Sequence, residues 1–165
     1  MGMFQKKSQT QLNFDSANPY PVLHEVEIVY SGPKFPLPLL IKSSRDSYEI
    51  LKEVYDKRKM DYKEMFYVLL LNHANYCLGV SQIGTGSTSG VAVNVKEIFQ
   101  LALKTNACKI IVSHNHPSGN LNPSEADKAI TLKIKAGCEA LDMTLLDHVI
   151  VTSGSYTSFA DEGML

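Results

Sequence analysis

Residues 109–127 of the chain read Lys-Ile-Ile-Val-Ser-His-Asn-His-Pro-Ser-Gly-Asn-Leu-Asn-Pro-Ser-Glu-Ala-Asp. The β-branched, apolar start of this stretch predicts a buried strand. Because alternate side chains of a strand share one face, His114 and His116 are expected side by side at its end. Turn-forming residues follow, and Ser-Glu-Ala-Asp begins a helix with Asp127 in its first turn. The stretch therefore predicts a strand, a loop and a helix that bring a carboxylate back to two imidazoles.

Two imidazole nitrogens and one carboxylate oxygen, with a fourth position open, are the typical ligand set of a catalytic Zn²⁺ site. A more ordinary interpretation exists for each residue. Ser124-x-x-Asp127 before an apolar helix is also a capping box, and single histidines are more often surface or core residues than ligands. Taken together, His114, His116 and Asp127 favour a site for one zinc ion per chain, while helix capping stays open for Asp127.

His-x-His-Pro-Ser-Gly followed by Pro-Ser-x-x-Asp resembles the signature of the JAMM (MPN+) metallohydrolases, in the form found in their bacterial RadC-like branch. The resemblance runs from about Tyr62 to the end of the chain, through Lys-Glu-Ile-Phe at 96–99, Leu-Leu-Asp-His-Val-Ile-Val at 145–151 and Ser-Phe-Ala-Asp-Glu-Gly at 158–163. It implies the cytidine deaminase-like fold of that family. It also implies a zinc ligand set of His114, His116 and Asp127.

The resemblance implies two further roles at the site. Ser124 would donate a hydrogen bond to the tetrahedral transition state, and Glu64 would serve as general base. Glu64 opens an apolar run at 64–72, where partial burial would raise its pKa toward a value useful for proton transfer. From the residues alone, a solvated glutamate at a strand end is the favoured interpretation of Glu64. Only the resemblance sets it ahead of three other acidic residues, Asp61, Glu97 and Asp147.

Hydrophobic periodicity predicts the remaining elements. The first part of the chain should form a strand over 26–30, a proline-rich segment over 32–38 and a helix from the cap Ser43 to about 59. A strand over 64–72, buried on both faces, should follow, then a turn over 73–75, a paired strand over 76–83 and a glycine-rich mobile loop over 84–90. The last part should form a helix capped by Asn94 and ending near 106, a helix over 125–136 and a strand over 145–151. This order predicts one three-layer α/β (α+β) domain with a mixed central sheet flanked by helices.

Two of these elements carry more detailed expectations. The helix over 125–136 should turn Ala129, Ile130, Leu132 and Ile134 toward the core, with Gly137 near its C-terminus. In the strand over 145–151, Asp147 and His148 point to opposite faces, so at most one of them approaches the metal site. Asp147 is a candidate for holding the other nitrogen of a ligand histidine, although an ordinary polar pair at a strand end explains it as well.

Composition limits the class of protein. With 165 residues, 44% hydrophobic and 20% charged, the chain can bury one core. We expect a flexible arm over 1–23, a strand and helix extension over 24–61, and the RadC-like domain over 62–165. The net charge of −1 gives no electrostatic footprint for tight binding to a phosphate backbone. Three cysteines without a Cys-x-x-Cys motif, no long apolar run and no signal pattern predict a cytoplasmic protein with reduced thiols and no membrane partner.

The expected function is metal-assisted hydrolysis. The resemblance implies a zinc enzyme that cleaves a peptide or isopeptide-like amide bond, so a peptide or protein substrate is expected. Two alternatives remain open. RadC-like members carry a historical label of DNA repair, which implies a DNA-associated protein with a nuclease-like or binding role. The second alternative is a non-catalytic, metal-binding interaction module.

Overall fold

The computed structural model describes residues 39–86 and 92–165 and is built around one apolar strand, β1 (Met65–Leu71). Every residue of β1 is buried. Its odd-numbered side chains pack on one face of the sheet and its even-numbered side chains on the other. The prediction of a central strand buried on both faces is confirmed. The expected N-terminal arm, the strand over 26–30, the proline-rich chain over 32–38 and part of the glycine-rich loop lie outside the described residues.

Within the described residues the sheet has five strands, in the order β2-β1-β3-β4-β5. Besides β1, these strands are β2 (Cys77–Thr85), β3 (Lys109–Asn115), β4 (Thr144–Val151) and β5 (Tyr156–Ser158). β3 pairs with β4 in parallel, and the other three pairings are antiparallel. The predicted hairpin between β1 and β2 is confirmed, and Asn75, at a φ of 64°, stands in its turn. β2 continues through Thr85, into the predicted glycine-rich loop.

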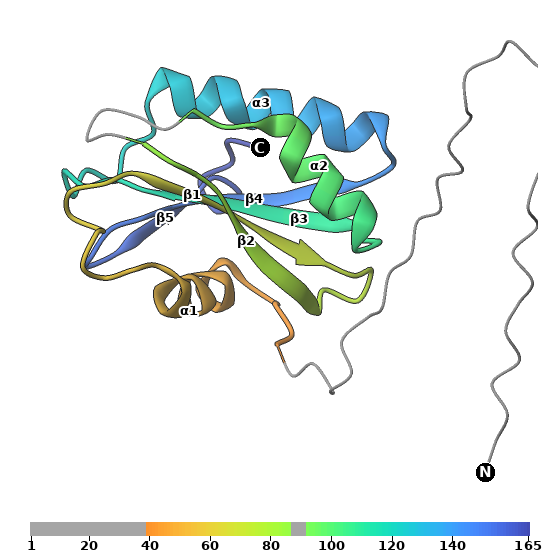
Figure 1. Cartoon of the computed structure of the whole chain (residues 1–165), viewed down its shortest axis with the longest axis horizontal. Coiled ribbons are helices and arrows are strands. Elements are labelled where there is room, and N and C mark those ends of the chain that lie inside the picture. The colour runs from red at the N-terminus through yellow and green to blue at the C-terminus, as the bar shows by residue number, and fades with distance from the viewer. Residues whose placement is uncertain (1–38, 87–91) are drawn as a thin grey trace, which may run out of the picture.

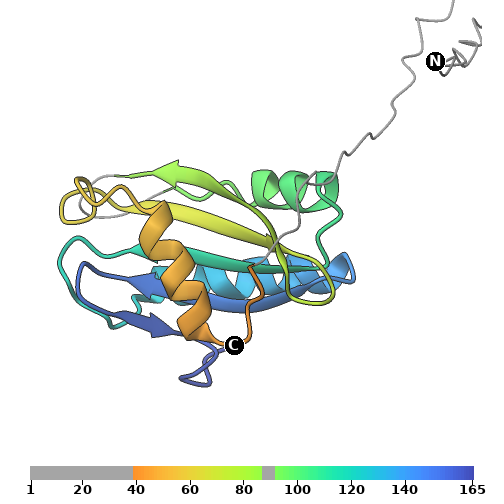
Figure 2. The same cartoon turned by 90° about the horizontal axis from the view of Figure 1, so that it is seen from below.

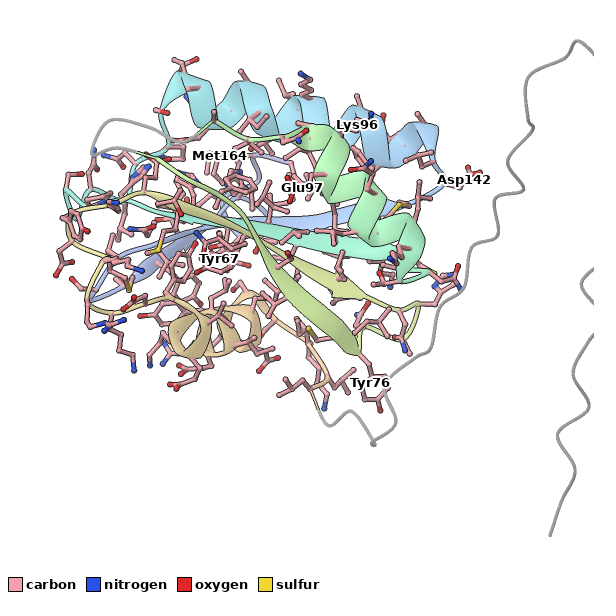
Figure 3. The ribbon with its side chains drawn as sticks, viewed as in Figure 1. Tyr67, Tyr76, Lys96, Glu97, Asp142 and Met164 are labelled. Carbon is pink, nitrogen blue, oxygen red and sulfur yellow. The ribbon has the colours of Figure 1, made fainter. Side chains whose placement is uncertain are left out.

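Helices cover both faces of the sheet, as Figure 1 shows. α1 (Ser44–Val54) lies on one side, and α2 (Val95–Lys104) and α3 (Glu125–Ala140) lie on the other. Figure 2, seen from below, shows α1 crossing the strands. In Figure 3, Tyr67 lies in the layer between the sheet and α1, where its ring packs edge-on against Tyr55 at 4.7 Å between centroids. The predicted three-layer α/β architecture is confirmed.

α1 is an integral part of this domain. Its Tyr48 and Leu51 join the same apolar cluster as the odd-numbered residues of β1. The expected cap at Ser43 is present as a capping box with Asp46. The helix ends at Val54, however, and not near residue 59 as the periodicity predicts. Tyr55 leaves the helix with an extended backbone, and its buried hydroxyl lies 2.9 Å from Ser113 Oγ on β3.

α3 is longer than predicted and turned differently. It continues past Gly137 to Ala140. Gly137 does not end the helix but allows a ring of α2 to pack closely against it. A Cβ atom at this position would lie 2.5 Å from the ring of Phe99 on α2. The face toward the sheet consists of Asp127, Thr131, Ile134 and Cys138. Of the side chains predicted to face the core, Ile134 is buried and Ile130 half-buried, whereas Ala129 and Leu132 are exposed.

α2 begins after Asn94, but the Asn94 side chain makes no capping hydrogen bond, contrary to the prediction. Ile98 and Ala102 of α2 are buried against the sheet, as its apolar stripe predicts. All three cysteines of the chain lie in the described part and are free. Within residues 39–86 and 92–165, no helix is both long enough and apolar enough to cross a membrane.

Candidate metal centre

β3 and α3 bring two imidazoles and a carboxylate together where the strand ends. His114 is in β3, and His116 follows it, with its backbone N–H donating to the carbonyl of Val151 on β4. Asp127 is in the first turn of α3. His114 Nε2 lies 2.9 Å from His116 Nε2 and 3.1 Å from Asp127 Oδ1. The convergence of the three residues predicted from the sequence is therefore present.

The atoms that converge are electron-pair donors. His116 Nδ1 lies 2.6 Å from the backbone carbonyl of Asn120, which can only accept a hydrogen bond. A neutral His116 therefore carries its proton on Nδ1, which leaves a lone pair on Nε2, the nitrogen nearest His114 and Asp127. Lone pairs this close repel one another unless a cation lies between them. Two imidazole nitrogens and a carboxylate oxygen suit a divalent transition metal such as zinc, so the residues fit a metal ion.

Asp127 serves the helix and the site at the same time. Its Oδ2 accepts hydrogen bonds of 2.7 Å from the backbone N–H and from the hydroxyl of Ser124, which completes the capping box. Its Oδ1 faces His114, and Oδ2 also lies 3.5 Å from His116 Nε2. The two interpretations of Asp127 in the sequence are thus compatible, because each can use a different oxygen.

The electrostatics of the group follow from this proximity. Partial burial acts to raise the pKa of Asp127, but the neighbouring His114 and His116 outweigh it and hold that pKa well below its ordinary value. Conversely, the pKa of His116 is raised, chiefly by its contact with Asp127. In the absence of a metal ion the same position attracts a proton.

Glu64 lies in the same pocket. It immediately precedes β1, which pairs with β3 so that Phe66 is opposite His114. Glu64 and His116, which lie beyond these paired residues at the same end of the sheet, both line the pocket. Glu64 is half-buried, and burial raises the pKa of its carboxyl, as the sequence analysis expected. The pocket has a volume of about 550 Å³ and is lined by Glu64, the three metal-ligand candidates and the loop that joins β3 to α3.

The comparison with known proteins agrees with this geometry. Residues 41–164 match the family model described as the RadC-like JAB domain. The chain belongs to this family. The resemblance inferred from the histidine motif is confirmed, and the matched region of this JAB domain includes α1.

Two relatives illustrate the similarity. A UPF0758 protein of Flavobacterium johnsoniae is 44% identical over 124 residues, which cover 75% of this chain and 53% of that protein. A UPF0758 protein of Haemophilus ducreyi is 44% identical over 100 residues, which cover 61% of this chain and 45% of that protein. The chain thus spans about half the length of the curated relatives it matches.

Ser124 lines the pocket of this JAB domain, but its hydroxyl is engaged in the helix cap. It donates to Asp127 Oδ2 and accepts from the Asp127 backbone N–H at 3.2 Å. To donate to a substrate oxygen, the hydroxyl proton would have to leave the Asp127 carboxylate. The role implied by the family resemblance therefore stays a prediction.

The residue that contacts the second nitrogen of His114 is His148, not Asp147. His148 Nε2 lies 2.8 Å from His114 Nδ1. Burial lowers the pKa of His148 well below its ordinary value. Asp147 points to the opposite face, as predicted, and accepts hydrogen bonds from Ser158 Oγ and from the backbone N–H of Ala160. The polar-pair interpretation of Asp147 is the one that agrees with these contacts.

Sequence reasoning missed Asn115, the residue between the two histidines. Its side chain is fully buried and binds the segment that carries Glu64. Asn115 Oδ1 accepts from the backbone N–H of Met65 at 2.7 Å, and Nδ2 donates to the carbonyls of Met60 and Lys63 at 2.7 and 2.8 Å. Strand alternation shows that Asn115 faces away from the histidines, but it cannot show what lies there.

Proposed function

We propose that this chain is a zinc-dependent hydrolase that cleaves an amide bond of a peptide or isopeptide type. One observation carries the proposal: His114, His116 and Asp127 each place a possible ligand atom within 4.8 Å of the others, in a pocket that is also lined by Glu64. These three residues would hold the metal. When bound, a zinc ion supplies Lewis-acid chemistry, because it polarises a carbonyl group and acidifies water.

The protein side chains would position and move protons around that centre. Glu64, with its raised pKa, would accept a proton from water on one carboxylate oxygen and return it to the leaving amine. Ser124 would donate a hydrogen bond from its hydroxyl to the oxyanion that develops on the substrate. The open pocket beside these groups would accept an extended peptide or protein segment, so we propose a peptide or protein as the substrate class.

Metal content and turnover test the proposal separately. Elemental analysis of the purified wild type should give one zinc per chain, and His116→Ala should lose it. Turnover is then measured on peptide libraries and on isopeptide-linked conjugates. Glu64→Gln should retain the metal and lose activity by about 10²-fold or more. Glu53→Gln, which changes a side chain that is 79% exposed on α1, is the matched control and should leave both readouts unchanged.

Each outcome points to a different conclusion. A wild-type protein without stoichiometric metal would exclude the proposed enzyme. A metal-bound protein whose biological effects survive Glu64→Gln would instead be a non-catalytic interaction module. The DNA-associated alternative stays a prediction, and it requires binding to DNA that weakens steeply with salt.

A further inference from the structure

A line of hydrogen bonds runs behind His114, on the side away from the pocket. His114 Nδ1 lies 2.8 Å from His148 Nε2, and His148 Nδ1 lies 2.6 Å from Thr131 Oγ1. Thr131 Oγ1 in turn lies 2.5 Å from the backbone carbonyl of Asp127. His114, His148 and Thr131 are each at most 2% exposed, so bulk water does not reach these polar atoms.

The carbonyl at the end of this line sets the direction of every hydrogen bond in it. A carbonyl oxygen can only accept, so the Thr131 hydroxyl donates its one proton to Asp127. Thr131 Oγ1 is then an acceptor for His148 Nδ1, which must carry a proton. Phe159 stacks on the His148 ring at 4.7 Å, and Phe66 packs edge-on against it at 5.7 Å. A second proton would leave an unbalanced charge in this apolar setting, so His148 Nε2 is a bare acceptor.

We propose that Thr131 and His148 are positioning residues that hold His114 as its Nδ1–H tautomer, which keeps His114 Nε2 free to bind the metal. This inference rests on the proposed metal site and extends it. An imidazole alone could not fix the tautomer of His114, because either of its nitrogens can carry the proton. Thr131 fixes the proton of His148 on Nδ1, so His148 Nε2 can only accept a hydrogen bond from Nδ1 of His114. We call the chain of hydrogen bonds from His114 through His148 and Thr131 to the Asp127 carbonyl the relay. His116 needs no relay, since the Asn120 carbonyl accepts directly from its Nδ1.

The relay also links the two elements that supply the ligands. Thr131 is four residues after Asp127, on the buried face of α3, and His148 is on β4 beside β3. The backbone of one ligand, Asp127, therefore determines the proton position on another ligand, His114. Hydrogen bonds of this kind to a ligand histidine fix its ring and increase its basicity toward the metal.

Removing the Thr131 hydroxyl without changing its shape tests the relay. The probe is zinc ion, titrated against a chelator of known affinity into metal-free protein. Thr131→Val should raise the dissociation constant for zinc by about 10- to 100-fold, the usual effect of losing such a partner. Thr131→Ser restores the hydroxyl and should recover most of that loss. Thr144→Val, at an exposed position of β4, is the matched control and should bind zinc like the wild type.

A second readout does not depend on the metal. Long-range ¹H–¹⁵N NMR of the metal-free wild type, at a pH above the histidine titrations, reports which nitrogen of each ring is protonated. We expect a proton on Nδ1 of both His114 and His148, and a changed pattern in Thr131→Val.

The two readouts separate failure of this inference from failure of the proposed function. An Nε2-protonated His114 in the wild type, or unchanged zinc affinity in a folded Thr131→Val, would overturn the relay. A wild type that binds no zinc would overturn the metal site, while the NMR spectrum would still decide the tautomer. If Thr131→Val does not fold, the wild-type spectrum decides alone.

Discussion

Asp127 Oδ1 lies 3.1 Å from His114 Nε2, while the other oxygen of the same carboxylate accepts two hydrogen bonds from Ser124. A helix cap and a metal-ligand candidate are therefore one side chain. The cap fixes the rotamer of Asp127 before any cation binds, which reduces the conformational entropy that binding has to overcome.

Two substitutions should separate these roles. Asp127→Asn keeps an oxygen that can cap α3 but removes the charge that His114 and His116 stabilise, so we expect loss of stoichiometric zinc and, with a chelator present, a lower free energy of unfolding as well. Ser124→Ala removes the capping hydroxyl and should lower that free energy by about 0.5–2 kcal/mol while zinc is retained. Elemental analysis and urea denaturation measure the two effects. Full zinc content in Asp127→Asn would contradict the assignment of this carboxylate as a ligand.

Asn115→Ala should affect stability and activity together. The substitution leaves the backbone N–H of Met65 and the carbonyls of Met60 and Lys63 without their partner. Each unsatisfied buried group costs about 1–3 kcal/mol, so we expect urea denaturation to show a loss of at least about 2 kcal/mol. Turnover should also fall, because Glu64 lies in the segment over 60–65 that Asn115 no longer holds. The zinc content should persist.

Asn94→Ala is the control for this substitution, since Asn94 is exposed and its side chain makes no capping hydrogen bond. It should change the free energy of unfolding by less than about 0.5 kcal/mol. An Asn115→Ala variant as stable as Asn94→Ala would show that the buried amide does not hold the segment.

The parts of the site that the sequence predicts are those determined by local geometry. His114 and His116 are two residues apart on a strand, and Asp127 follows a helix-start motif, so periodicity alone brings these side chains to the right ends of their elements. Their partners were not predictable in this way. Asn115, Thr131 and His148 take their roles from contacts that depend on the packing of distant elements.

One open alternative and one error have the same origin. The alternation of β4 puts Asp147 and His148 on opposite faces, but only the parallel pairing of β3 with β4 decides which of them reaches His114. Glycine near a helix end is likewise ambiguous, because it can stop the helix or allow another element to approach. Gly137 does the latter.

Leu51→Ala and Leu132→Ala test which leucines belong to the core. Leu51 of α1 is fully buried, whereas Leu132 of α3 is 63% exposed. The first substitution should lower the free energy of unfolding by about 2–5 kcal/mol, because it leaves a cavity between α1 and the sheet. The second should change it by less than about 0.5 kcal/mol. Similar losses in both variants, measured by urea denaturation, would contradict the observed rotation of α3.

Gly137→Ala should reverse the usual effect of this substitution in a helix. Alanine normally stabilises a helix interior by about 1 kcal/mol relative to glycine. Here the added methyl group would overlap the Phe99 ring, so thermal denaturation should show a lower melting temperature. In a Phe99→Leu background the same change should be neutral or stabilising. A melting temperature raised by Gly137→Ala in the wild-type background would mean that α2 moves aside freely.

Asp147→Asn should change how stability depends on pH. Burial raises the pKa of the Asp147 carboxyl above its ordinary 3.8, although hydrogen bonds from Ser158, Ala160 and the His148 backbone oppose the shift. The unfolded chain therefore releases this proton at a lower pH than the folded protein. As pH rises from about 3.8 through the folded pKa, the folded state holds more protons than the unfolded state, and the free energy of unfolding falls.

The asparagine variant has no such titration, so the wild type should lose stability relative to Asp147→Asn across that interval and stay at a constant difference above it. Urea denaturation of both proteins at a series of pH values, with a chelator present so that metal binding contributes to neither, measures the difference directly. A wild type that instead gains stability over the variant as pH rises would mean that the three hydrogen bonds outweigh burial, and that Asp147 is held as a stabilised anion beneath the sheet.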